Sequence, residues 1–336
     1  MSDATLAVHF AGALVTLQDG GRLGHLRYGV AASGPMDRVA FAAANAALGN
    51  VANKTAIEVS LGGLIVECKS GALTLAIAGG DFMIEHAGAK TNGWTVLTLR
   101  EGERLSVRVG SAGSWAYIAF AGDVVAKEWL GQTATHSTTG FGGGAIQTGQ
   151  QLVVEHADIR EDREGLIEQP DFLPGGVRIR VVMGPQDMWF RTEAIAVFKN
   201  TRYKLTNNYD RMGVRLEGEH LALDAALSIP SEPIVRGSVQ VTGEGVPTVL
   251  LADHHTTGGY PKIATVISTD INVLVQKRSG QEISFEAIPS EVAVKIARQF
   301  AQDVACYLAK VSIPRGNLQQ RLMQQNLISG AVGLDD

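Results

Sequence analysis

Short apolar runs separated by glycine-containing turns recur along most of the sequence. In the first half they cover residues 64–66, 73–78, 96–99, 105–109 and 116–121, with turns such as Lys69-Ser70-Gly71 between them. Runs of this length and spacing are typical of antiparallel strands, and 39 glycines against 10 prolines supply many turns. The pattern therefore predicts an antiparallel sandwich or barrel and not an alternation of strands and helices.

The second half of the chain opens a new series of strand-like runs. Val177, Ile179 and Val181 alternate with Arg178 and Arg180, as in a strand with one solvent-exposed face. Further runs cover residues 203–206, 214–216, 239–241, 248–251, 264–267, 273–276 and 283–285. Because residues 158–174 are charged and poor in strand signals, we expect them to link two units. The expected division is 1–165, 175–312 and a C-terminal tail at 313–336.

Two segments have helical periodicity instead. The first follows Ser-Gly-Pro-Met-Asp at 33–37, is rich in alanine up to Leu48, and ends at Gly49-Asn50, a typical C-terminal stop. The second begins near Ser290 and repeats apolar residues at helical spacing as far as Leu308. The predicted fold class is therefore mainly β with a few helices: two β-barrel or sandwich units with one N-terminal and one C-terminal helix.

Charge and composition argue against several classes of protein. The net charge is −5 and no basic run resembles a nucleic-acid footprint, so we expect no nucleic-acid partner. No apolar run approaches the roughly 20 residues of a membrane span, and residues 1–10 lack a secretory signal, so we expect a cytoplasmic protein. Cys68 and Cys306 are the only cysteines, and their apolar surroundings predict two reduced core residues.

Several common catalytic and cofactor motifs do not occur in the sequence. There is no G-x-x-x-x-G-K-[ST] phosphate loop, and the glycine-rich stretch at 140–149 contains no lysine. No lysine lies in a Met-Lys-Met-like hairpin that could carry biotin, and there is no G-x-S-x-G nucleophile motif. We expect no covalently bound cofactor. If the protein works with ATP or biotin, another polypeptide carries much of that chemistry.

The stretch "LLADHHTTGGYPKIATVI" at 250–267 places many polar residues between two strand-like runs. His254 and His255 are adjacent, and neighbours on a strand point to opposite faces, so they are poorly placed to share a metal ion. The other six histidines form no ligand spacing with one another or with a carboxylate. We therefore expect no metal site.

Lys262 is the more informative residue of this stretch, because a proline precedes it and an apolar run follows it. An isolated lysine at a strand end is usually a surface residue, but a desolvated one titrates low or pairs with a carboxylate, here Asp210 or Asp253. Polar and glycine residues gather at strand ends in this half, namely Asp210, Arg211, Gln240, Asp253, Thr256, Thr257, Gly258, Gly259 and Lys262. Such a set suits a small polar molecule with carbonyl or amide groups.

Five motifs in order resemble those of one known family. They are "TLQDGGRLGHLRYGVAASGPMDRVAFAAANAALGN" at 16–50, "MGPQD" at 183–187, "YDRMGVRLEG" at 209–218, the whole of 231–267, and Asp270. Over about residues 6–310 the chain resembles the family of the 5-oxoprolinase C subunit and of urea amidolyase-related proteins. That family is also described as KipA-type, as similar to the second subunit of allophanate hydrolase, or as biotin-dependent carboxyltransferase.

The resemblance implies a cyclophilin-like β-barrel fold and a hetero-oligomeric enzyme. It implies a homologous KipI-type partner (the B component), together with a LamB/YcsF-type partner (the A component), in the ATP-dependent opening of 5-oxoproline to glutamate. One alternative is the carboxyltransferase component of a biotin-dependent urea or amide carboxylase, with biotin carried on a partner. A second alternative is a non-catalytic regulator that binds a KipI-type kinase inhibitor.

The resemblance also assigns roles to individual residues. It implies that Asp210, Arg211 and Lys262 are catalytic, with Asp210 accepting a hydrogen bond from an amide N–H and Lys262 stabilising charge on a carbonyl oxygen. It implies that a second set binds the substrate, consisting of Gln240, Thr256, Thr257, Gly258, Gly259 and Tyr260, and of Gln18, Arg22, Ser33 and Asp37 from the first unit. We expect these last four to line a cleft between the units. His254-His255 departs from the family, where Arg-Gln is commoner, which leaves the substrate open.

Overall fold

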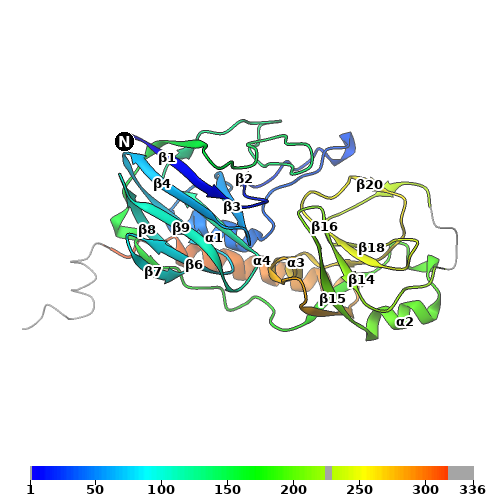
Figure 1. The fold of residues 1–336 in the computed structure, drawn as a ribbon. Coiled ribbons are helices and arrows are strands. Elements are labelled where there is room, and N and C mark those ends of the chain that lie inside the picture. The colour runs from blue at the N-terminus through cyan, green and yellow to red at the C-terminus, as the bar shows by residue number, and fades with distance from the viewer. Residues whose placement is uncertain (1, 224–228, 317–336) are drawn as a thin grey trace, which may run out of the picture.

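The computed structural model describes residues 2–223 and 229–316. Figure 1 shows two β-rich units side by side. In the first unit, a seven-stranded antiparallel sheet has the order β11 (Asp123–Val124), β12 (Gln151–Ala157), β1 (Ser2–Ala11), β4 (Leu64–Ser70), β9 (Arg104–Ala112), β6 (Asp81–His86) and β7 (Ala89–Asn92). A six-stranded antiparallel sheet has the order β13 (Gly165–Leu166), β8 (Thr95–Arg100), β5 (Ala72–Ala78), β10 (Trp115–Phe120), β3 (Ala56–Ser60) and β2 (Thr16–Gln18).

The six-stranded sheet is covered on both faces. In β5, Leu75 and Ile77 belong to the core shared with the seven-stranded sheet, whereas Ala76 and Ala78 face helix α1 (Arg38–Leu48). The small alanines on both elements allow the helix to approach the sheet closely. Asp37 caps the first turn by accepting hydrogen bonds from two backbone amides, and Gly49 ends the helix with φ +71°. The predicted helix and its stop are confirmed.

The second unit is a closed seven-stranded barrel. Its order is β14 (Arg178–Met183), β21 (Lys262–Val266), β18 (Ser238–Val241), β19 (Pro247–Leu250), β16 (Gly213–Glu217), β15 (Arg202–Tyr209) and β22 (Glu282–Ala287). The parallel pair of β14 and β22 closes the barrel. A small ribbon of β17 (Glu232–Pro233) and β20 (Thr257–Gly258) stands beside it, and α2 (Thr192–Asn200) packs against β22. Short 3-10 helices η1 (Leu26–Tyr28), η2 (Glu161–Arg163) and η3 (Asp187–Trp189) complete the described elements.

The predicted fold class is confirmed, but the helix content was underestimated. Residues 273–276, predicted to be a strand, form the end of helix α3 (Ser268–Gln276). Its buried residues Ile271, Leu274 and Val275 have the spacing of a helix, and a run of three apolar residues at 273–275 cannot be told from a strand by periodicity alone. With α2 and α3, the described part of the chain contains two helices more than the sequence predicted.

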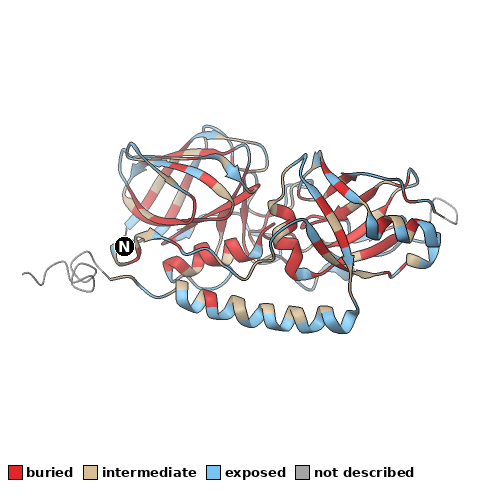
Figure 2. Ribbon diagram, turned by 90° about the horizontal axis from the view of Figure 1, so that it is seen from below, coloured by how far each residue is buried: buried red, intermediate tan, exposed pale blue. Residues whose placement is uncertain are grey.

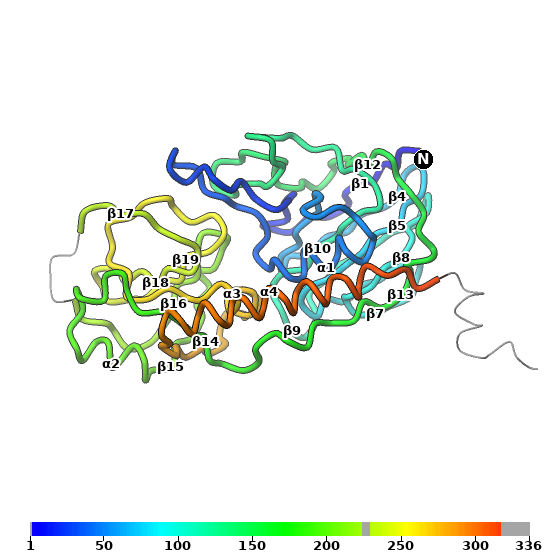
Figure 3. Tube along the Cα trace, turned by 180° about the vertical axis from the view of Figure 1, so that it is seen from behind, coloured from blue at the N-terminus to red at the C-terminus, as the bar shows by residue number. Residues whose placement is uncertain are grey.

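The C-terminal helix α4 (Ser290–Val311) runs along both units (Figures 2 and 3). It contacts α3 at the barrel and α1 of the first unit, and Tyr307 is its one buried residue. Cys306 lies on its exposed side, so the expectation of a core residue is wrong there, whereas Cys68 is buried. Among the described residues, no helix combines the length and the apolar character required to cross a membrane. Residues 317–336, most of the predicted tail, lie outside the described residues.

Candidate functional site

The two units meet at a buried cluster of charges centred on Arg211. Its Nε and Nη2 donate to the carboxylate of Asp253 at 2.9 and 3.0 Å, and its Nη1 pairs with Glu58. Nη2 also donates to the carbonyl of Gly34 at 2.8 Å. The three charged side chains are fully buried. Because Arg211 and Asp253 belong to the second unit and Glu58 to β3 of the first, the cluster joins the units.

Hydrogen bonds extend this cluster into the first unit. Glu58 accepts from the Tyr117 hydroxyl at 2.7 Å and from the Met36 amide at 2.8 Å, and Asp253 accepts from the Ser137 amide at 2.9 Å. Burial acts to raise the pKa of Asp253, but the charge and hydrogen bonds of Arg211 lower it below its usual value. Asp253 is therefore a carboxylate at neutral pH.

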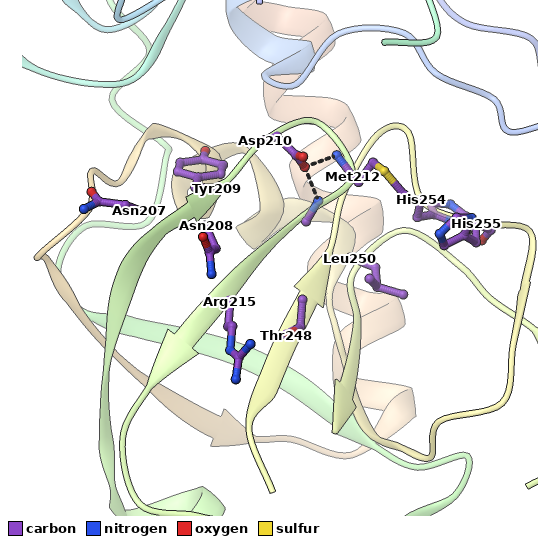
Figure 4. A pocket seen from close by; sticks show the side chains of 11 residues that line it. Asn207, Asn208, Tyr209, Asp210, Met212, Arg215, Thr248, Leu250, His254 and His255 are labelled. Atoms are coloured by element: carbon purple, nitrogen blue, oxygen red, sulfur yellow. Dashed lines mark hydrogen bonds between the residues drawn. The ribbon is translucent and has the colours of Figure 1, made fainter. Parts of the chain in front are cut away.

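Two cavities that share lining residues open beside the cluster. The larger, of about 580 Å³, is lined mainly by β15, β16 and the turn between them, including Asp210, and by His254 and His255 (Figure 4). The smaller, of about 300 Å³, lies between the units, with His136 and neighbouring threonines on one side and residues 254–257 on the other. Met212, His254 and His255 line both cavities. We call the two cavities together the interunit cleft.

Asp210 lines the larger cavity and is exposed. Its Oδ1 accepts hydrogen bonds from the backbone amides of Met212 at 2.7 Å and Gly213 at 3.2 Å, shown as dashed lines in Figure 4. One carboxylate oxygen is thus used by the turn between β15 and β16. The sequence "DRM" therefore separates into an exposed carboxylate, a buried guanidinium and a thioether in the cleft.

Two histidines of the cleft make hydrogen bonds to neighbouring residues. His254 donates its Nδ1–H to the carbonyl of His255 at 2.6 Å, and burial lowers its pKa. The Nδ1 of His136 lies 2.9 Å from the hydroxyl of Thr139. Within residues 2–223 and 229–316, no group of three or more histidine, cysteine or carboxylate side chains is arranged to hold a metal ion.

Lys262 lies at the first position of β21 and is only 1% exposed, so of the two alternatives that the sequence left open the structure shows the buried lysine. Its Nζ is 3.9 Å from the half-exposed carboxylate of Glu232 and makes no hydrogen bond to any described residue. Burial lowers the pKa of Lys262. Gln186 fixes the surroundings, because its Oε1 accepts from the Lys262 amide at 2.9 Å and its Nε2 donates to Glu232 at 2.5 Å. Gln240 is the neighbour of Lys262 across the sheet.

One part of the loop between His255 and Lys262 lies in the cleft, and the other part lies near Lys262 at the barrel. Thr256 and Thr257 line the cleft, whereas Gly258 packs on the barrel, where an added Cβ would lie 2.6 Å from Ile234 and 2.9 Å from the amide of Gln240. The carbonyl of Gly259 accepts from Ile229 at 3.0 Å, and Tyr260 is 45% exposed. Lys262 is not among the residues that line the cavity of Asp210, so the structure does not bring the two predicted catalytic residues into one cavity.

None of the four polar residues of the first unit that were expected in the cleft is among the residues that line its two cavities. Gln18, Arg22, Ser33 and Asp37 are all at most 3% exposed. Gln18 donates to the Thr135 carbonyl, Arg22 donates to the carbonyls of Trp129 and Ala134, and Asp37 caps α1 while accepting from Gln276 at 2.8 Å. Gln18 and Arg22 therefore satisfy buried backbone carbonyls of a neighbouring loop, and the Asp37 carboxylate is used by the helix cap. The Ser33 hydroxyl is buried and has no hydrogen-bond partner among the described residues.

Four further residues around the site received no role from the sequence: Glu58, His136, Gln186 and Glu232. Glu58 carried a usable signal. It interrupts the short run "AIEVS" at 56–60, and a carboxylate within a buried strand requires a partner. Gln186 lies in the "MGPQD" motif, but only the fold shows that its side chain reaches β21.

The chain matches the family model described as "Carboxyltransferase domain, subdomain A and B" over residues 28–287. The protein therefore belongs to this carboxyltransferase domain family. It is 32% identical to the C subunit of 5-oxoprolinase from Haemophilus influenzae, covering 84% of this chain and 91% of that protein. It is 34% identical to the C subunit of 5-oxoprolinase from Escherichia coli, covering 87% of this chain and 94% of that protein.

Two solved structures have a similar fold. The crystal structure of TTHA0988 matches with a TM-score of 0.75 and 31% identity over 84% of this chain, and the chain spans 55% of the length of that protein. The urea carboxylase of Kluyveromyces lactis matches with a TM-score of 0.80 over 91% of this chain and 29% of that protein. At 23% identity, this second likeness shows the fold alone.

Proposed function

We propose that the chain is one subunit of an ATP-dependent enzyme that opens 5-oxoproline to glutamate. Two relatives that bear the name of the 5-oxoprolinase C subunit support this, because each aligns over more than nine tenths of its own length. A protein named as one subunit implies further polypeptides. We expect a KipI-type partner and a LamB/YcsF-type partner, and we expect ATP to act at the level of the complex.

The observation that carries the proposal is the Lys262 ammonium. It is buried, and no described residue accepts a hydrogen bond from its Nζ. A buried cation without an acceptor is unfavourable in the free protein, and a polar ligand with a partial negative charge relieves that penalty. In a lactam, the amide oxygen carries this charge, and more of it develops as the amide bond is attacked.

The loop from Asp253 to Lys262 connects this cation with the interunit cleft. We propose that the substrate lies along this loop, with Lys262 holding the amide oxygen and the glycines at 258 and 259 allowing a close approach of the backbone. For Asp210 to accept from the N–H of the same amide, through the oxygen that the turn does not use, the loop would have to move, because the structure does not bring Asp210 and Lys262 into one cavity. Hydrolysis of the ring amide adds water and yields the carboxylate and amine of glutamate, at the expense of ATP.

A second candidate is transfer of a carboxyl group to urea or a similar amide. The description of the matching family model favours it, because it names a carboxyltransferase domain. The same contacts to an amide oxygen and N–H would serve, and biotin would be carried on a partner polypeptide. The two candidates differ in the product: glutamate in one, a carboxylated amide in the other.

The test is to purify the chain with its KipI-type and LamB/YcsF-type partners and to measure ATP-dependent release of glutamate from 5-oxoproline. Lys262→Met should reduce the rate about a hundredfold or more. Lys277→Met is the matched control, because the Lys277 ammonium donates to the Gly176 carbonyl on the surface. No glutamate from the complete wild-type complex would overturn the proposal, and carboxylation of urea by a complex containing a biotin carboxylase would favour the alternative.

A further inference from the structure

We infer that Arg211 is a positioning residue which fixes both walls of the interunit cleft through Glu58 and Asp253. We call these three side chains the interunit clasp. This inference rests on the proposed function for its kinetic consequence, but its structural part stands separately. It replaces the direct role in catalysis that the family resemblance implied for Arg211.

Every nitrogen of the Arg211 guanidinium donates a hydrogen bond. Nε, Nη1 and Nη2 each donate to a carboxylate, and Nη2 also donates to the Gly34 carbonyl. With a side chain that is 0% exposed, Arg211 can contact a substrate only if these bonds break. A planar fork of donors matches two carboxylates in fixed directions, whereas the point charge of a lysine does not.

Each carboxylate partner of Arg211 also holds a segment of the first unit by accepting a hydrogen bond from its backbone. Glu58 accepts from the Met36 amide and so holds the turn that precedes α1. Asp253 accepts from the Ser137 amide and so holds the loop that carries His136, Thr138 and Thr139. One guanidinium therefore ties the turn at 34–36 and the loop at 136–139 to the second unit.

The loop held by Asp253 lines the cleft. His136, Thr138 and Thr139 form one wall of the smaller cavity, and residues 254–257, directly after Asp253, form the opposite wall. Met212, directly after Arg211, lines both cavities. The clasp thus lies where the two walls join, and its loss would release both of them.

The charges explain why the clasp needs its hydrogen bonds. The Arg211 guanidinium donates to three of the four carboxyl oxygens of its two partners. The Tyr117 hydroxyl and the Met36 amide donate to the fourth, Oε2 of Glu58, and the Ser137 amide adds a further bond to Asp253. Because a carboxylate that loses its cation must find new donors or take up a proton, we expect the held segments to move when Arg211 is replaced.

The experiment is hydrogen exchange of the full chain, followed by kinetics of the reconstituted complex. In Arg211→Lys we expect at least tenfold faster exchange in both 136–139 and 253–257. We expect a fall in kcat of at least tenfold with KM for 5-oxoproline changed less than threefold, because misaligned groups slow the reaction even when substrate still binds. The matched control is Arg278→Lys, since Arg278 also joins the units, through the carbonyls of Gly110 and Gly113. It should change neither segment nor kcat.

Faster exchange confined to residues 207–216 would overturn the inference, because Arg211 would then stabilise only its own turn. A lower kcat with unchanged exchange would also overturn it, in favour of direct catalysis. If Arg211→Lys does not fold, Asp253→Asn gives the same exchange test with a shape-preserving change. If the wild-type complex leaves 5-oxoproline intact, the proposed function fails, and the exchange data alone decide on the clasp.

Discussion

Replacing Lys262 with methionine should make the folded chain more stable while the activity is lost. The lysine stem is buried in the barrel and its Nζ makes no hydrogen bond to any residue of the described ranges. Methionine has a similar length and no charge, so it keeps most of the packing and removes a desolvated cation. Most substitutions of buried residues destabilise a protein, so a gain in stability would be a specific result.

The expected magnitude follows from two opposing contributions. At 3.9 Å the attraction between Lys262 and Glu232 is about 4 kcal/mol at an effective dielectric constant of 20, and about 1 kcal/mol at that of water. Glu232 is half exposed, so the smaller figure applies more closely. Burying an ammonium group costs several kcal/mol. The net gain on replacement should then be about 1–3 kcal/mol, or roughly 1.5–4 °C in Tm for a chain of this size.

Thermal unfolding as a function of pH provides the assay. Burial lowers the pKa of Lys262 in the folded chain, whereas the pKa in the unfolded chain is about 10.4. Between these two pKa values, the unfolded chain holds a proton on Lys262 that the folded chain does not. Stability of the wild type therefore rises with pH through this range, and the advantage of Lys262→Met should shrink as pH approaches 10. A variant that is less stable than the wild type at pH 7 by 1 kcal/mol or more would refute the reasoning, since the ammonium would then make a favourable contact.

Three further predictions concern the cleft and the interface. Tyr117→Phe removes one of the donors to Glu58 and leaves the buried Asp37 amide without its acceptor, so urea denaturation should show a loss of about 1–3 kcal/mol; an unchanged midpoint would contradict this. Burial lowers the pKa of His254, so the unfolded chain takes up a proton below about pH 6.5 that the folded chain does not. The free energy of unfolding of the wild type should therefore fall with decreasing pH by up to about 1.4 kcal/mol per pH unit more than that of His254→Gln. If the two variants show the same dependence of stability on pH, the imidazole of His254 is not buried in its neutral form. Asp210→Asn keeps the oxygen that holds its turn, so stability should change by less than about 0.5 kcal/mol. Its rate of glutamate release should fall about tenfold or more, and a full rate would remove Asp210 from the site.

The β-rich fold could be predicted because its signals are local. The strands of the six-stranded sheet have two covered faces, strands of the seven-stranded sheet such as β6 alternate between a buried and a more exposed face, and the turns between strands carry glycine. The helix at 38–48 also has a local cap and a local stop. Helix α3 lacks such signals: its N-cap is Ile267, without a capping side chain, and its apolar run is short. Its N-terminal turn is stabilised by a distant residue instead, because Asp270 binds Arg180 of β14 with a bidentate ion pair.

The sequence indicated those features of the candidate site that depend on one residue and its neighbours along the chain. It did not indicate the contacts between residues of different units. The proline before Lys262 and the apolar run after it made burial one of two alternatives for this lysine without any knowledge of the fold. Arg211 and Asp210 are adjacent, so the family motif suggested one shared task, but the turn between β15 and β16 directs one side chain to solvent and the other into the interface. The decisive partner, Glu58, is 153 residues away in sequence and lies in the other unit. A carboxylate in a buried strand and an arginine in a turn each indicate a missing partner, and only the assembled units show that each is the partner of the other.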